Sequence, residues 1–197
     1  MIQYPDRQSA SIRIDLSTEP FNVGGGLARV RAGLNRAVTA AATSLVRHHF
    51  RELVRTNCNE YGLPPAFWPR MIRETSGQAT TRGGEVRLPR EVAHRYLGGV
   101  IEPKNGARAL TIPVIAAAYH QRARDISGLR YYPADPRTDG GYVGFLGRPS
   151  ESGEGPEIYY NLVRRARQDG QKFVLPKPEE LETAVRAAIK RFTAKLH

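Results

Sequence analysis

Two hydrophobic periods follow each other in the first third of the amino-acid sequence. Between residues 11 and 17, apolar and polar side chains alternate one by one, which predicts a half-buried strand. From residue 27 to about residue 56, apolar side chains recur every three or four positions, which predicts one helix of roughly 30 residues. Glycines at 24–26 separate the two, so residues 1–26 are expected to form an N-terminal strand and a Gly-rich linker.

Shorter elements fill the rest of the chain. The pattern predicts helical segments at 66–74, 91–97 and 116–126, a polar loop at 76–84, and short strands at 85–88, 109–114, 129–132, 142–146 and 157–164. A closing helix begins near Pro178, where a proline and two glutamates suit a first helical turn. This order predicts a single α+β domain over residues 1–197, with the long N-terminal helix and the C-terminal helix packed on a small, mostly antiparallel sheet.

One stretch between the late strands is unusually rich in glycine and proline. Residues 138–156 hold six glycines, which is a long, punctuated connection for a compact domain. Residues 133–156 are therefore expected to form an extended, flexible loop or arm.

An excess of positive charge distinguishes the composition. The chain has 30 basic and 19 acidic residues, a net charge of +11, and 25 of the basic residues are arginine. Three interpretations remain open: contact with nucleic-acid phosphates, ion pairs with acidic neighbouring subunits, and a solvated surface encoded by a GC-rich genome.

Other features exclude whole classes of protein. No apolar run approaches the roughly 18 residues that a membrane span needs, and the N-terminus does not resemble a secretory signal, so no membrane contact is expected. Cys58 is the only cysteine, which excludes an internal disulfide and a cysteine-based zinc site.

Motifs for catalysis are missing from the sequence. The adjacent His48 and His49 diverge by about 100° on a helix and cannot share one metal. Neither a nucleophile elbow nor a phosphate-binding loop occurs. We therefore expect no catalytic residues, no metal and no cofactor, and we expect that the protein is not an enzyme.

Tyrosines and arginines gather on the late predicted strands. Such a cluster either stacks bases or anchors protein–protein contacts, and the second interpretation is favoured because tyrosine and arginine are enriched at interfaces. The candidate subunit-contact or channel-facing residues are Tyr142, Phe145, Arg148, Arg130, Tyr159, Tyr160, Arg164 and Arg165.

Four stretches of the chain resemble the phage virion morphogenesis family, also described as Mu-type tail-completion or head–tail joining proteins. They are LVRHHFREL (45–53), AFWPRMIRE (66–74), the long run from Ala93 to Tyr132, and YYNLVRRARQDGQKFVLPKPEELETAVRAAIKRF (159–192). The third stretch is the most specific, and the resemblance is weakest over 133–156, where this chain is longer and richer in glycine.

The resemblance implies a structural virion protein in the neck of a tailed phage, a tail terminator or head–tail connector. It implies a ring of copies of this chain around the DNA channel, expected as a hexamer, assembled in the cytoplasm of the bacterial host. The implied partners are other neck, portal-side adaptor or tail-tube proteins, with contact to packaged DNA. The alternative is a basic nucleic-acid-binding protein.

Overall fold

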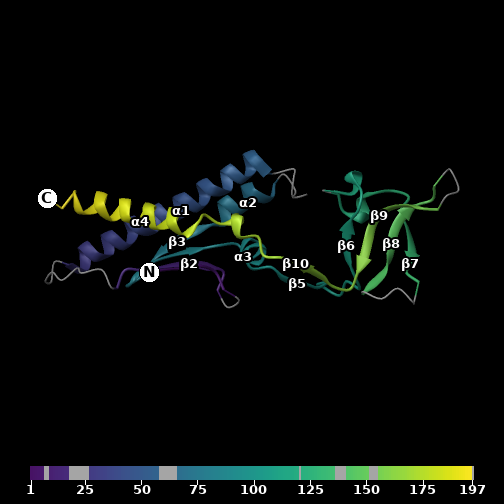
Figure 1. The fold of residues 1–197 in the computed structure, drawn as a ribbon, viewed down its shortest axis with the longest axis horizontal. Coiled ribbons are helices and arrows are strands. Elements are labelled where there is room, and N and C mark those ends of the chain that lie inside the picture. Colours follow the sequence, from purple (N-terminus) through teal and green to yellow (C-terminus); the bar gives the residue numbers. More distant parts are fainter. Residues whose placement is uncertain are drawn as a thin grey trace. The chain divides into compact units, whose positions relative to one another are not determined.

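The computed structural model describes residues 1–6, 9–17, 27–57, 66–119, 121–135, 141–150 and 155–196. Packing divides the described chain into two compact units (Figure 1). The first unit comprises described residues of 1–58, 65–98 and 169–197, and the second comprises those of 99–168. The second unit is thus inserted into the chain of the first.

The sheet of the first unit has a buried face and a polar face. Its four antiparallel strands follow the order β1 (Ile2–Gln3), β2 (Ser11–Asp15), β4 (Gly83–Arg87), β3 (Ser76–Ala79). Ile12 and Ile14 of β2 are buried, whereas Arg13 between them is exposed. The strand predicted from the alternation at 11–17 is therefore confirmed.

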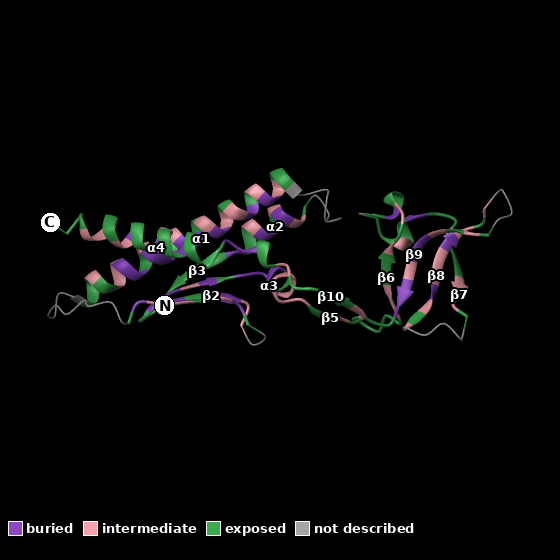
Figure 2. Ribbon diagram, in the orientation of Figure 1, coloured by how far each residue is buried: buried purple, intermediate pink, exposed green. Residues whose placement is uncertain are grey.

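The long helix α1 (Leu27–Asn57) packs on β3 and β4 of this sheet, and the C-terminal helix α4 (Pro178–Thr193) packs on α1. Two short helices, α2 (Phe67–Glu74) and α3 (Arg90–Leu97), complete the unit. Buried residues mark one side of α1 and α4 (Figure 2). On α1 they include Val38, Val46 and Phe50, and the Phe50 ring lies 5.4 Å from the ring of Trp68. The predicted α+β class, with two helices and small antiparallel sheets, is confirmed.

Two glycines allow the helix to approach the sheet closely. A Cβ at Gly77 would overlap the hydroxyl of Thr43, and a Cβ at Gly84 would overlap the hydroxyl of Thr39. Both threonines are buried, and each donates its hydroxyl to a carbonyl one turn earlier in α1, Thr39 to Asn35 at 2.6 Å and Thr43 to Thr39 at 2.8 Å. The close contact therefore leaves neither hydroxyl without a hydrogen-bond acceptor.

A four-stranded antiparallel sheet forms most of the second unit, in the order β6 (Leu110–Pro113), β9 (Glu157–Val163), β8 (Tyr142–Arg148), β7 (Arg130–Pro133). A two-stranded ribbon of β5 (Gly99–Ile101) and β10 (Ala166–Gln168) lies at the two ends of the inserted segment. The four strands predicted over residues 109–164 are confirmed, and every end agrees to within two residues.

The range 133–156 differs from the loop or arm expected there. Its middle is β8, a strand of seven residues with a partner on each side. Residues 136–140 and 151–154 lie outside the described part of the chain. Glycine is tolerated in β8 because Gly144 lies against the backbone of β7 and Gly147 lies against the backbone of β9, where a Cβ would collide.

Two other predicted segments are corrected. Part of the polar loop expected at 76–84 is the strand β3, which forms a hairpin with β4; its polar residues Ser76 and Gln78 are exposed. The helix expected at 116–126 is reduced to two short 3-10 turns, Ala116–Ala118 and Ala123–Asp125. The hydroxyl of Tyr160 bonds to the carbonyls of Ala118 and Gln121, two groups that a continuous helix would use itself.

Hydrogen bonds within the first unit join residues 95–96, just before the inserted segment, to residues 171–172, just after it. The backbone N–H of Gln171 donates to the carbonyl of Arg95 at 2.8 Å, and the Arg95 guanidinium donates to the Gln171 side chain at 3.1 Å. Lys172 donates to the carbonyl of Tyr96 and lies 4.1 Å from the centre of its ring. Tyr4 stacks on Tyr96 and donates to Pro176, and burial raises the pKa of the Tyr4 phenol.

Replacing Gly84 by alanine tests the close approach of α1 to the hairpin. We expect Gly84→Ala to lower the free energy of unfolding by about 1–3 kcal/mol, because the new methyl group overlaps Thr39. Thr39→Ala in the same chain removes the overlapping hydroxyl and should recover part of the loss, so the two changes couple in a double-mutant cycle. Urea unfolding followed by circular dichroism measures both; equal stability of Gly84→Ala and the unchanged protein would contradict the packing.

Candidate functional site

The second unit brings together the residues that the sequence proposed as a contact surface. Tyr142, Phe145 and Arg148 lie on β8, Arg130 lies on β7, Tyr159 and Tyr160 lie on β9, and Arg164 and Arg165 follow β9 directly. These three strands are neighbours in one sheet. The predicted cluster is therefore a cluster in space, but its members have different environments.

One row of side chains crosses the whole sheet. The register places Tyr132 opposite Phe145, Phe145 opposite Asn161, and Asn161 opposite Ile112, so the four share one face. The rings of Tyr132 and Phe145 stack with centroids 5.1 Å apart, and Asn161 donates to the Tyr142 hydroxyl at 3.0 Å. Ile112 is 38% exposed and Tyr142 is 44% exposed. We call these five residues the aromatic face.

Tyr159 and Tyr160 belong to the core of the unit instead. Tyr160 is only 2% exposed and clusters with Ala118 and Ile126. Burial, and secondarily the charge of Asp125, raise the pKa of the Tyr160 phenol. As the unit stands, these two rings stabilise it from within and offer no contact surface.

Arg148 also has an internal role. Its guanidinium donates to the carbonyl of Ser127 at 3.1 and 2.9 Å and lies 5.1 Å from the ring centre of Tyr159. It therefore fastens the turn before β7 to β8. Arg130, Arg164 and Arg165 are exposed, and none of the three forms an ion pair with a described residue. They remain candidates for contact with an acidic partner.

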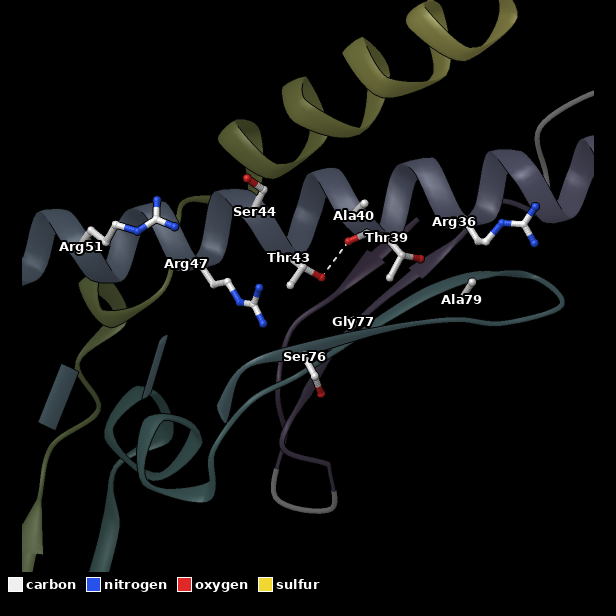
Figure 3. A pocket seen from close by; sticks show the side chains of 10 residues that line it. All are labelled: Arg36, Thr39, Ala40, Thr43, Ser44, Arg47, Arg51, Ser76, Gly77 and Ala79. Atoms are coloured by element: carbon white, nitrogen blue, oxygen red, sulfur yellow. Dashed lines mark hydrogen bonds between the residues drawn. The ribbon is translucent and has the colours of Figure 1, made fainter. Parts of the chain in front are cut away.

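The first unit carries a second basic feature, a groove of about 500 Å³ between α1 and β3 (Figure 3). We call it the arginine groove. Its walls are Arg36, Thr39, Ala40, Thr43, Ser44, Arg47 and Arg51 from α1 and Ser76, Gly77 and Ala79 from β3. The α1 residues recur every three or four positions, which puts them on one stripe of the helix.

Positive charge in the arginine groove is not neutralised within the described chain. Arg47 donates to the backbone carbonyl of Thr75 at 3.2 and 2.6 Å, and the groove has no acidic lining residue among those described. Neither Arg36 nor Arg51 has a described carboxylate within ion-pair distance. Arg36 and Arg51 are thus available to an external anion.

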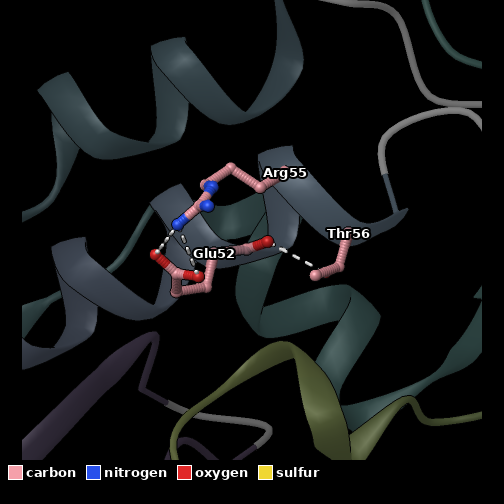
Figure 4. A network of polar contacts seen from close by, with 3 residues as sticks. All are labelled: Glu52, Arg55 and Thr56. Atoms are coloured by element: carbon pink, nitrogen blue, oxygen red, sulfur yellow. Dashed lines mark hydrogen bonds and ion pairs between the residues drawn. The ribbon is translucent and has the colours of Figure 1, made fainter.

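Arg55, further along the same helix, shows the contrast (Figure 4). Its guanidinium lies 3.4 Å from Oε1 of Glu52, and the Glu52 carbonyl accepts a hydrogen bond from Thr56 at 2.8 Å. Both charged side chains are well exposed, so this pair contributes little to stability. The Glu52 carboxylate nevertheless neutralises the charge of Arg55, whereas no described carboxylate pairs with Arg36 or Arg51.

The arginine groove is not evident from the sequence alone. The spacing of Arg36, Arg47 and Arg51 indicates a shared helix stripe, but the other wall was expected to be a loop. The strand β3 supplies that wall only because it pairs with β4.

Within the described ranges, no group of three histidine, cysteine, aspartate or glutamate residues could hold a metal ion. None of the helices in the described part of the chain is long and apolar enough to cross a membrane.

Comparison of the chain with protein families, with curated proteins and with solved structures found no match.

Removing one phenol group tests the internal role of Tyr160. Tyr160→Phe should destabilise the second unit by about 1–3 kcal/mol, because the buried Ala118 carbonyl and the part-buried Gln121 carbonyl lose the one phenol donor that they share. The matched control is Tyr131→Phe, since the exposed Tyr131 donates to the carbonyl of Val143 at 2.9 Å and should matter far less. Hydrogen exchange of the β8 and β9 amides reads out the unit directly; equal protection in the two variants would contradict the assignment.

Proposed function

We propose that the protein is a structural subunit of a tailed-phage virion, a neck or tail-completion protein that forms a ring around the DNA channel. The four stretches that resemble the phage virion morphogenesis family support this proposal. The most specific of them, from Ala93 to Tyr132, runs from α3 of the first unit through β5 and β6 to β7 of the second. The role is to join parts of a particle and not to transform a substrate.

The single observation that carries the proposal is where apolar surface is exposed. Nine large apolar side chains are exposed among the described residues, and six belong to the second unit, the smaller of the two. These six are Val100, Ile112, Val114, Tyr119, Tyr131 and Tyr142. Two of them, Ile112 and Tyr142, lie together on the aromatic face, and an exposed apolar patch of this kind marks a surface that a partner covers.

Ring formation suits such a surface. Copies arranged head to tail use two different patches, and a ring closes when the rotation between copies divides the circle. The aromatic face is our candidate for one of these patches. The basic excess would then serve acidic portal-side or tail-tube neighbours, or packaged DNA.

Deleting the gene from the phage or prophage that encodes this chain tests the role. We expect complete heads and complete tails that are not joined, or tails of abnormal length, visible in negative-stain micrographs. Supplying the unchanged gene in trans should restore joined particles. Normal infectious virions from the deletion strain would contradict the proposal.

Complementation with surface variants tests the aromatic face within this role. Ile112→Asp combined with Tyr142→Asp should lower the yield of infectious particles by at least about tenfold, because charges replace apolar contact residues at an interface. Leu196→Asp, in the first unit and 51% exposed, is the control and should retain the yield. If both variants complement equally well, the aromatic face is not a contact surface.

A nucleic-acid-binding protein is the second candidate, favoured by the arginine groove and by the exposed Arg164 and Arg165. For this function the affinity for duplex DNA should fall steeply with salt concentration, as phosphate contacts require. Fluorescence anisotropy with a labelled duplex measures it. Absence of binding at physiological salt would exclude this candidate.

A further inference from the structure

The arginine groove has a geometry that selects a particular kind of ligand. Its helix wall and its strand wall run side by side in opposite directions. Asn35 donates to the carbonyl of Thr80 at 2.7 Å, Thr43 lies against Gly77, and Arg47 donates to Thr75. From residue 35 to 47 a helix rises about 18 Å, and from residue 75 to 80 a strand rises about 17 Å, so the two walls match in length.

The strand wall is a free sheet edge. β3 is the last strand in the order β1-β2-β4-β3, and its only ladder partner among the described strands is β4. Outside that ladder, residues 76–79 make no backbone–backbone hydrogen bond with the described part of the chain. An edge of this kind offers N–H and C=O groups to a further strand.

The residues that carry these groups can be derived from the hairpin. Thr80 donates its N–H to the carbonyl of Gly83, so the pair 80–83 is hydrogen-bonded. In an antiparallel ladder such pairs alternate with pairs that are not hydrogen-bonded. Gly77 and Ala79 fall in the second kind, and their N–H and C=O groups point away from β4. Both residues line the arginine groove.

Two arginines place positive charge at the ends of the helix wall. Arg36 and Arg51 stand at the two ends of the helix stripe, 15 residues apart, which corresponds to about 22 Å. An extended chain of about seven residues spans that distance. Between them the stripe carries the small side chains of Ala40 and Ser44, which leave room for a backbone, and Arg47, whose guanidinium donates to Thr75 at the end of the strand wall.

We propose that the arginine groove binds an extended, acidic polypeptide segment of another protein, which adds to β3 as a further strand. Backbone groups of the segment pair with Gly77 and Ala79, and its carboxylates bind Arg36 and Arg51. Pairing on a free edge provides affinity and the arginines provide selectivity for acidic side chains. The inference does not rest on the proposed virion role, because the aromatic face belongs to the second unit and the groove to the first.

A nucleic acid is the less suitable ligand. Its phosphates would neutralise the arginines, but it has no row of alternating N–H and C=O groups to pair with the edge of β3. A second copy of this chain is also a less suitable ligand, because none of its described strands holds more than one acidic residue. An acidic partner that is extended over about seven residues satisfies both walls.

The probe for the test is a short, capped, fluorescent peptide that alternates glutamate with valine. Binding to the full chain is measured by anisotropy, and the amide signals of Gly77 and Ala79 are followed by NMR. We expect saturable binding, shifts of both amides, and at least about tenfold weaker binding of the same peptide with lysine in place of glutamate.

Paired variants separate the two walls. Arg36→Gln with Arg51→Gln should weaken binding at least about tenfold, whereas Arg29→Gln with Arg31→Gln, which removes the same charge from exposed positions of α1 outside the groove, should retain it. Ala79→Pro removes only an outward N–H and should weaken binding similarly, since proline is tolerated on an edge strand. Circular dichroism confirms that each variant is folded.

Three outcomes would overturn the inference. Binding that is equal in the two double-arginine variants would show a non-specific charge effect. Unchanged binding in Ala79→Pro would exclude strand addition. Binding of a DNA duplex that depends on Arg36 and Arg51, with no binding of the peptide, would assign the groove to nucleic acid. None of these outcomes decides whether the deletion strain joins its heads and tails, so the two proposals fail independently.

Discussion

The packing of α1 on the β3–β4 hairpin is the contact on which the first unit depends. It places Thr39 and Thr43 of the helix against Gly84 and Gly77 of the hairpin, so that backbone and side chain meet with little intervening space. This contact buries the apolar face of the sheet, and α4 then packs on another side of the same helix. It also fixes the distance between the arginine stripe and the free edge of β3, which defines the arginine groove.

The insertion gives the protein two separate surfaces with different chemistry. The second unit has a core of its own, closed by Tyr160 and Arg148, and leaves aromatic and aliphatic side chains exposed. The first unit has the larger core and an arginine-lined groove. A protein that joins parts of a particle needs to contact more than one partner, and two chemically distinct surfaces allow that.

Local periodicity predicted most of the elements, because helices and half-buried strands leave a mark in the spacing of their apolar residues. The alternation through Ile12 and Ile14, the long run of α1 and the proline start of α4 are examples. Elements whose conformation is set by hydrogen bonds to other segments and not by an apolar period were not predicted. β3 is polar and gains its hydrogen bonds from β4, and the segment at 116–126 is held as two turns by Tyr160 from a strand about 40 residues away. The division into two units likewise left no mark in composition.

For the candidate site, the sequence located the tyrosine–arginine cluster. It could not separate the buried Tyr159 and Tyr160 from the exposed Tyr142, because burial depends on the bulged register of β8 with β9.

In the proposed function, this chain is a building block of a virion and neighbouring subunits cover its exposed apolar surface. A cryo-electron-microscopy reconstruction of the neck of the intact phage particle tests it most directly. The account predicts a closed ring of this chain around the channel, with Ile112 and Tyr142 buried between subunits. A complete neck that contains no copy of the chain, or a ring in which those two side chains face solvent, would contradict it.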